Sequence, residues 1–113
     1  MSTIAKAGIL LSDRSRWTQG ALARNARGRP TCFKRAASWD ILGAILAQGS
    51  QTESAMRRDG MNNQNAAAAG YAQRAALRLF KMSAETVNDT MGHDQVLAVL
   101  RLAWKMESGA QKK

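Results

Sequence analysis

The chain of 113 residues contains one cysteine and one histidine, a pair of residue types that often supplies a nucleophile and its base. Cys32 and His93 are 61 positions apart and belong to no local signature, and a lone cysteine commonly packs as a small apolar residue. The chain also lacks a glycine-rich phosphate loop, a GxSxG turn and an HExxH helix. We therefore expect a protein that is not an enzyme, with a Cys32–His93 dyad as the catalytic alternative.

The sequence around His93 is the other place that resembles a chemical site. Asn88, Asp89 and Asp94 offer oxygen atoms to a cation, whereas zinc sites usually need more His or Cys ligands than this chain has. Asn and Asp also favour turns and helix starts. We expect Asn88, Asp89 and Thr90 to form a turn and the side chains near His93 to cap the next helix. No metal and no cofactor is predicted.

Positive charge is the strongest compositional feature, because 17 Lys and Arg stand against 8 Asp and Glu, a formal net charge of +9. The segment from residue 14 to residue 39 has no acidic residue and seven basic ones: Arg14, Arg16, Arg24, Arg27, Arg29, Lys34 and Arg35. Such a block neutralises phosphates in a salt-dependent way that is largely independent of base sequence. Trp17 and Phe33 within it could stack on bases. The alternative is a solvated loop of arginines with both aromatic rings in the core.

Four segments repeat apolar residues with the period of an α-helix. They cover about residues 3–11, 36–48, 65–82 and 94–107. The apolar arc of the second is wider than half the circumference, which predicts a buried central helix with Ser38 as N-cap and Gly49 at its end. The fourth is apolar around most of its circumference, so we expect it to lie in the middle of the fold or to contact a partner. The pattern predicts a mainly α, compact four-helix domain spanning residues 1–113.

The connections between these helices are polar or rich in glycine. Between the first two helices we expect a small β-hairpin with strands at about 21–24 and 31–33 and a turn near Arg27 and Gly28. The stretch at about 49–64 predicts a long flexible loop.

The two remaining features are a tail and a basic helix edge. A disordered tail is expected at about 108–113. The third helix carries Arg74, Arg78 and Lys81 on one edge. This edge would extend the basic surface if the helix packed beside the hairpin, and would otherwise be an ordinary solvated edge.

Cysteine usage and hydropathy indicate the compartment. A single Cys32 cannot form an internal disulfide, which is typical of a reducing environment. The first eleven residues are interrupted by Lys6 and have no basic leader, so they do not resemble a signal peptide. No stretch approaches the roughly 18 consecutive apolar residues that a membrane span needs. We expect a cytoplasmic protein with no membrane contact.

Four strings in the sequence resemble the pattern of a small bacterial and phage family of unknown function. They are RWTQGALARNARGRP at 16–30, WDILGAI at 39–45, VND at 87–89 and HDQVLAVL at 93–100. The similarity extends from about residue 12 to residue 106, and the first string is the most specific. The motif residues for which we expect a structural role are Trp17, Gln19, Trp39, Asn88, Asp89 and His93.

Three positions depart from the family pattern: Asp40 replaces a Cys, Val87 replaces the Trp of W-N-D, and Gly92 replaces the Thr before His93. The first two remove groups that a family-wide thiol or aromatic site would need, which further disfavours an enzyme. The resemblance implies a compact, mainly helical domain from a bacterial or phage genome, and a bacterial cytoplasm as its location. It implies no established activity.

Three functions remain open from the sequence. The first is a non-catalytic basic protein that engages nucleic acid or a nucleoprotein. Its expected contact residues are Arg24, Arg27, Arg29, Lys34, Arg35, Arg74, Arg78 and Lys81. The second is a phage inhibitor of host defence, similar to anti-CRISPR proteins, that binds an acidic surface of a host protein. The third is self-assembly as a homo-oligomer through the helix at about 94–107.

Overall fold

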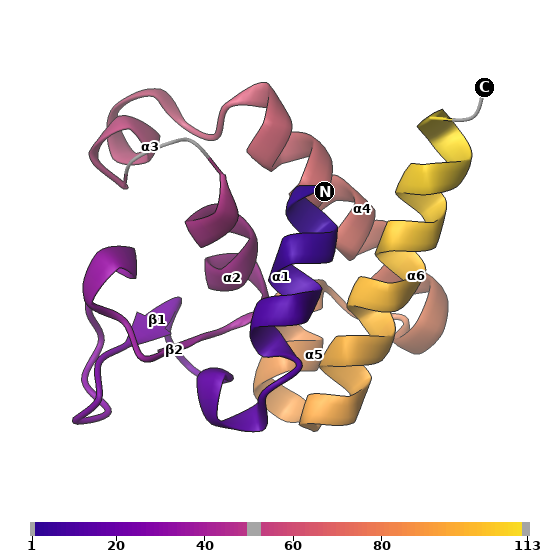
Figure 1. Cartoon of the computed structure of the whole chain (residues 1–113). Helices are drawn as coiled ribbons and strands as arrows, with labels where there is room; N and C mark the ends of the chain where they lie inside the picture. Colours follow the sequence, from indigo (N-terminus) through magenta and orange to yellow (C-terminus); the bar gives the residue numbers. More distant parts are fainter. Residues whose placement is uncertain (1, 50–52, 112–113) are drawn as a thin grey trace.

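A computed structural model of the chain contains six α-helices among the residues that it describes (Figure 1). The structure describes residues 2–49 and 53–111, apart from the side chains of Lys34, Glu53 and Gln111. In chain order the elements are α1 (Thr3–Leu11), the 3-10 turn η1 (Arg14–Arg16), β1 (Ala23–Arg24), the 3-10 turn η2 (Phe33–Arg35), β2 (Ser38–Trp39), α2 (Ile41–Gln48), α3 (Glu53–Asp59), α4 (Asn63–Phe80), α5 (Ala84–Thr90) and α6 (His93–Gln111). The mainly α fold is confirmed, with two helices more than the four expected.

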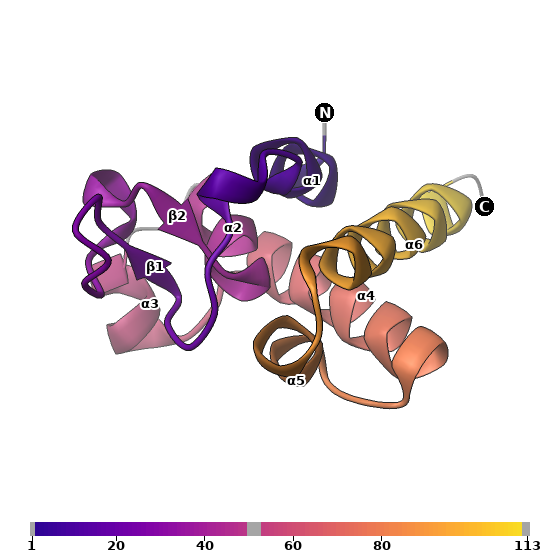
Figure 2. The same ribbon diagram turned by 90° about the horizontal axis from the view of Figure 1, so that it is seen from below.

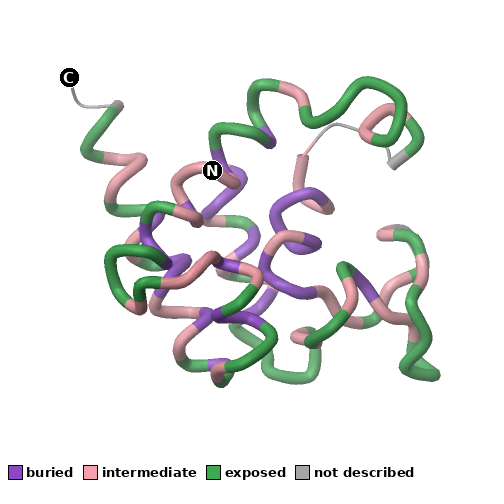
Figure 3. Tube along the Cα trace, turned by 180° about the vertical axis from the view of Figure 1, so that it is seen from behind, coloured by how far each residue is buried: buried purple, intermediate pink, exposed green. Residues whose placement is uncertain are grey.

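The two ends of the molecule differ in structure. Figures 1 and 2 show β1, β2 and the loop between them at one end, and α6 with the C-terminal end of α4 at the other. Figure 3 shows that the part of the loop directly after β1 is exposed, and residues 26–30 are exposed throughout. No helix in the described ranges is long and apolar enough to cross a membrane.

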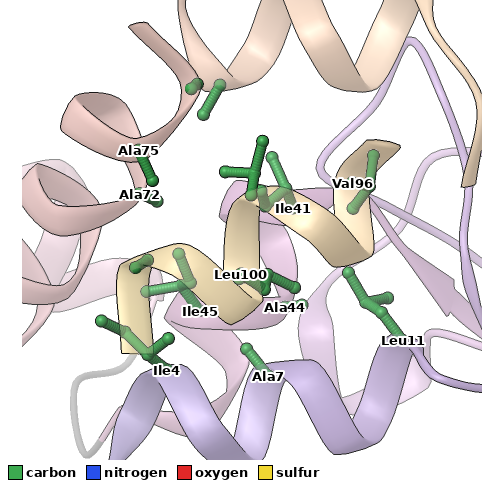
Figure 4. Close-up of a cluster of buried hydrophobic side chains, with 14 of the residues drawn as sticks. Ile4, Ala7, Leu11, Ile41, Ala44, Ile45, Ala72, Ala75, Val96 and Leu100 are labelled. Carbon is green, nitrogen blue, oxygen red and sulfur yellow. The ribbon is translucent and has the colours of Figure 1, made fainter. Parts of the chain in front are cut away.

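Helix α2 lies at the centre of the packing, as its wide apolar arc predicts. It contacts α1, α4 and α5. Ile41, Ala44 and Ile45 are almost completely buried, and Figure 4 shows them among side chains from α1, α4 and α6. A helix that is apolar on most sides needs neighbours on most sides, and α2 has them.

Helices α4 and α6 pack against each other through small and branched side chains. Helix α4 buries Ala68, Ala72, Ala75 and Ala76, and α6 buries Val96, Val99, Leu100 and Ala103. Alanines allow close approach of the two backbones. Helix α6 also contacts α1 and α5, while Trp104 on α6 remains 48% exposed, so the chain itself covers only part of the apolar surface of this helix.

Helix α2 begins later than the sequence pattern predicts. Its N-cap is Asp40, whose side chain accepts a hydrogen bond from the backbone N–H of Gly43. Ser38 is instead in β2, paired with Arg24 of β1. The prediction of Ser38 as N-cap is therefore wrong, because strand pairing holds residues 38 and 39 in an extended conformation.

The expected turn near Arg27 and Gly28 is present, but the strand partner differs from the prediction. β1 pairs with β2 in an antiparallel register, Ala23 opposite Trp39. Residues 30 and 31 lie on the other edge of β1, where Pro30 forms a single bridge with Arg24 and the Thr31 N–H donates to the Ala23 carbonyl. Pro30 has no N–H to donate to a ladder, which disfavours a regular strand there.

Helices α3 and α5 are the two that the periodicity misses. Each has seven residues, too short to show a clear apolar repeat. α3 lies within the polar stretch expected to be a flexible loop, of which residues 50–52 are outside the described residues. α6 continues to Gln111 through most of the expected tail, and residues 112 and 113 are outside the described part. Whether these segments are flexible stays a prediction.

Candidate functional site

Asn88 is the centre of a buried polar cluster that joins distant parts of the chain. It is 0% exposed. Its Oδ1 accepts from the Trp17 indole N–H at 2.8 Å and from the Ile41 backbone N–H at 2.9 Å. Its amide nitrogen donates to the Thr18 carbonyl at 3.0 Å and to Asp89 Oδ1 at 3.1 Å. Both N–H groups and the side-chain oxygen are therefore in use, which leaves this side chain no free donor for a ligand.

Gln19 and Asp89 extend the same cluster towards the surface. The Gln19 amide nitrogen donates to the carbonyls of Asn88 and Met91, at 2.9 and 3.0 Å. Asp89 Oδ1 accepts from the Gly20 backbone N–H at 2.9 Å. The segment after η1 is thus fixed to the C-terminal end of α5 across about 70 residues of sequence. The expected turn at residues 88–90 is wrong, because these residues form the last turn of α5.

His93 is buried beneath the end of α1. Its Nε2 lies 2.5 Å from the Leu11 carbonyl oxygen, which can only accept, so Nε2 carries the proton. The Trp17 ring lies 5.5 Å from the imidazole, centroid to centroid. His93 thus satisfies a C-terminal carbonyl of α1, while the side chain of Gln95 accepts from the Gly92 N–H before α6. The His93 imidazole therefore caps the C-terminal end of α1. It does not cap α6, the helix that begins at His93.

Asp40 and Trp39 lie beside this cluster. Asp40 is 7% exposed and no basic side chain pairs with it among the described residues. Burial raises the pKa of this carboxyl from 3.8 to about 6, with the carboxylates of Asp89 and Glu85 adding to the shift and the Gly43 N–H opposing it. The Trp39 carbonyl accepts from the Thr18 N–H, and its buried indole nitrogen has no partner among the described residues.

Arg24 was predicted to contact a ligand, but the structure uses its guanidinium inside the protein. It donates to the Thr18 hydroxyl at 3.1 Å, to the Gly28 carbonyl at 3.0 Å and to the Gln19 carbonyl at 3.0 Å. Two of these acceptors precede β1 and one lies in the loop after it, so the guanidinium group links the two segments. Arg24 is therefore a residue that shapes the loop.

The segment 25–35, which we call the arginine loop, is ordered by Asn25. The Asn25 side-chain oxygen accepts from the backbone N–H groups of Arg27 at 2.9 Å and Arg29 at 3.1 Å, and the Asn25 carbonyl accepts from the Gly28 N–H. Gly28 has a φ of 81°, a conformation that other residues rarely adopt. Asn and Gly are residue types that favour turns, and they account for the turn that the sequence predicts near Arg27 and Gly28.

The side chains of Arg27, Arg29 and Arg35 are exposed on the arginine loop. The side chain of Lys34, predicted with them, lies outside the described residues. No acidic residue occurs between residues 14 and 39 to compete for these guanidinium groups. A loop that is held by backbone bonds and presents unengaged charge can bind phosphates with little ordering cost.

The basic edge of α4 does not extend this surface. Arg74, Arg78 and Lys81 are exposed, and Arg74 lies over the Tyr71 ring at 4.6 Å. Figures 1 and 2 show the C-terminal end of α4 at the end of the molecule opposite the arginine loop. α3 lies nearer the loop's end of the molecule, where it carries exposed Arg57 and Arg58. The Arg58 guanidinium is 3.0 Å from the Asp59 carboxylate, so Arg57 is the freer cation of the two.

The residues considered for a catalytic dyad or a metal site lie in different surroundings. Cys32 is exposed in the arginine loop, whereas His93 is buried with Nε2 on the Leu11 carbonyl. Within the described ranges, no three His, Cys, Asp or Glu side chains form a group that could hold a metal ion. Asp94, considered as a ligand from the sequence, is exposed in the first turn of α6.

These features define a mainly helical domain in which a buried polar cluster supports an exposed basic loop. Residues 2–106 match a family described as a family of unknown function, DUF6197, and the chain belongs to this family. The expected membership of a family of unknown function is thereby confirmed. No curated protein and no solved structure matches the chain.

Proposed function

We propose that this protein is a non-catalytic binding protein that contacts nucleic acid, free or within a nucleoprotein, through the arginine loop. The observation that carries the proposal is the pre-ordered turn at 25–29, which presents Arg27 and Arg29 to solvent without an acidic neighbour in the segment. Guanidinium groups bind phosphate oxygens in a bidentate manner. Contacts of this kind position a protein on a phosphate backbone without reading base sequence.

The proposal assigns different roles to the basic residues of this region. Arg27, Arg29 and Arg35 act directly, whereas Arg24 acts by holding the loop. Trp17 gives little support to base stacking, because its ring is engaged with Asn88 and His93. The proposal is therefore phosphate binding by charge, with no requirement for single strands.

An electrophoretic mobility shift assay tests the proposal with a labelled duplex DNA and a single strand of equal length. We expect binding at about 50 mM salt that is largely lost at about 200 mM. The double substitution Arg27→Glu with Arg29→Glu should weaken binding at least about tenfold.

Arg74→Glu with Arg78→Glu is the matched control, because it makes the same change in net charge at the other end of the molecule. It should leave binding within about threefold of the native protein. An absence of binding at low salt, or equal losses in the two double variants, would overturn the proposal. Equal losses would mean that net charge alone attracts the DNA.

A further inference from the structure

An open apolar groove of about 590 Å³ lies between α1 and α6. Within the described ranges its walls come from these two helices and from the residues that cap α1, Ser2 and Ser12. Ile4 and Leu100 form its inner part, and Ile9 and Trp104 stand at its opening. Figure 1 shows α1 near the middle of the molecule and α6 on the side away from β1 and β2, so the groove is separate from the arginine loop.

The two large side chains at the opening are unusually exposed for apolar residues. Ile9 is 60% exposed and Trp104 is 48% exposed. A single exposed apolar residue needs no explanation, whereas two large ones on opposite sides of one apolar groove point to an interaction site. An exposed tryptophan at the edge of such a groove is the residue type most often found to dominate binding energy.

The spacing of the lining residues determines the shape of the occupant. Ala5 and Ile9 are four apart on α1, and Leu97 and Trp104 are seven apart on α6, so each helix contributes one stripe parallel to its axis. A groove between two helices that pack side by side accepts a third helix, whose own stripe packs between the two. The stripe from residue 97 to residue 104 is roughly 10 Å long, which corresponds to about two turns in contact.

The charged residues around the groove indicate which kind of partner helix would bind there. Arg101 is the charged residue that lines it, and no acidic residue lines it in the described part of the chain. Lys105 lies one turn beyond Arg101, and Lys6 lies three residues before Ile9, and both are exposed. A second copy of this chain would bring Arg101 close to its own equivalent, in a protein of net charge +9. A helix with acidic flanks has the complementary charge.

We propose that the groove between α1 and α6 binds an amphipathic helix of a partner protein, with an apolar stripe between Ile9 and Trp104 and acidic side chains against Arg101. This site is separate from the arginine loop. The protein would then bind nucleic acid and a protein partner on two separate surfaces, and binding in the groove does not depend on the loop.

Gly8 provides a way to fill the groove without disturbing the fold. It lines the groove, and a Cβ added there would meet nothing within 4 Å. Gly70, in the middle of α4, has equally open surroundings outside the groove. Gly8→Leu and Gly70→Leu are therefore a matched pair, both uncharged and both in helices.

The test uses two synthetic helical peptides of roughly 11 residues, identical in their leucine stripe and flanked by either Glu or Lys, with binding measured by calorimetry. We expect the Glu peptide to bind with a Kd on the order of 10 μM and the Lys peptide to bind at least about tenfold more weakly. Gly8→Leu and, separately, Trp104→Ala should each weaken the Glu peptide at least about tenfold, and Gly70→Leu should not. Arg101→Glu should reverse the preference between the peptides, and Arg74→Glu should not.

Three results would overturn the proposal. The first is equal binding of the two peptides, or binding of neither. The second is a loss of affinity that is the same for Gly8→Leu and Gly70→Leu, which would place the peptide elsewhere. The third is a dimer in sedimentation equilibrium that Gly8→Leu dissociates, which would make a second copy of the chain the occupant. The circular dichroism spectrum of each variant confirms that it is folded.

Discussion

Asn88 connects the segment after η1, the first turn of α2 and the end of α5 through one side chain. Its bonds to Trp17, Thr18 and Ile41 are all made in the protein interior. A buried donor or acceptor that loses its partner costs about 1–3 kcal/mol. The Asn88 side chain therefore acts as a structural connector between these three segments.

We expect Asn88→Ala to lower the free energy of unfolding by about 2–4 kcal/mol, because it leaves the Trp17 and Ile41 N–H groups without their acceptor. Asn63→Ala, at an exposed position at the start of α4, should change it by less than about 0.5 kcal/mol. Urea unfolding monitored by tryptophan fluorescence measures both. A cost below about 1 kcal/mol for Asn88→Ala would show that the cluster does not hold the fold together.

Asp40 gives the protein a pH dependence whose sign follows from its buried position. The pKa of this carboxyl is raised from 3.8 to about 6 in the folded state. Below the lower value both states hold the proton. Between the two values only the folded state holds it, so stability falls as pH rises through this window and stays lower above it.

Asp40→Asn keeps a good N-cap and removes the ionisation. The stability of this variant relative to the native protein should increase between pH 4 and pH 7 by on the order of 1–3 kcal/mol. Asp94→Asn, at an exposed position, is the control for the loss of one negative charge. Urea unfolding at both pH values decides the matter. If the free energy of unfolding differed between Asp40→Asn and the native protein by the same amount at both pH values, the burial of an ionisable carboxyl would be contradicted.

At the scale of elements, the contact between α2 and the segment before β1 depends on Gly43. A Cβ on Gly43 would overlap the carbonyl oxygen of Leu22, which also accepts from the Asp40 N–H. Helix propensity alone favours alanine at this position. The close approach of two backbones therefore explains a glycine inside a buried helix.

Gly43→Ala should lower the free energy of unfolding by about 1–3 kcal/mol, since the segment carrying Leu22 must move away from α2. Gly70→Ala, in open surroundings on α4, should raise it by about 0.5–1 kcal/mol through helix propensity. Thermal unfolding of the two variants compares them directly. A gain of stability in both variants would contradict the close approach of Gly43 to the Leu22 carbonyl.

Sequence periodicity was a good guide to the long helices and a poor guide to the short elements. α1 has the predicted bounds, and α4 and α6 differ from the prediction mainly at their ends. α5 was missed although Ser83 is a recognisable N-cap whose hydroxyl accepts from the Thr86 N–H. A helix of two turns buries one or two apolar residues, and so few cannot establish a period.

At the scale of the whole molecule, net charge and its placement have different consequences. A formal charge of +9 attracts any polyanion at low salt, whereas the proposed function would confine phosphate contacts to the arginine loop at one end of the molecule. The apolar groove between α1 and α6 lies outside that end. Two separate surfaces are consistent with a protein that connects two partners.

The logarithm of the DNA affinity should decrease linearly with the logarithm of salt concentration, with a slope set by the number of neutralised phosphates. Arg27→Ala with Arg29→Ala should make the slope shallower by about 2, and Arg74→Ala with Arg78→Ala should leave it unchanged. Fluorescence anisotropy over a salt series measures the slopes. Identical slopes in the two double variants would show that the loop makes no phosphate contacts.

The sequence by itself determined the mainly helical class, the central position of α2, the turn in the arginine loop and the acid-free run of basic residues. These features depend on local periodicity, turn chemistry and composition. The tertiary structure alone decided that Asn88 bonds to residues near position 18, that His93 caps α1, that Arg24 is engaged within the loop, and that the basic edge of α4 lies at the far end of the molecule. Each of these depends on which segments meet in space, and spacing along the chain does not contain that information.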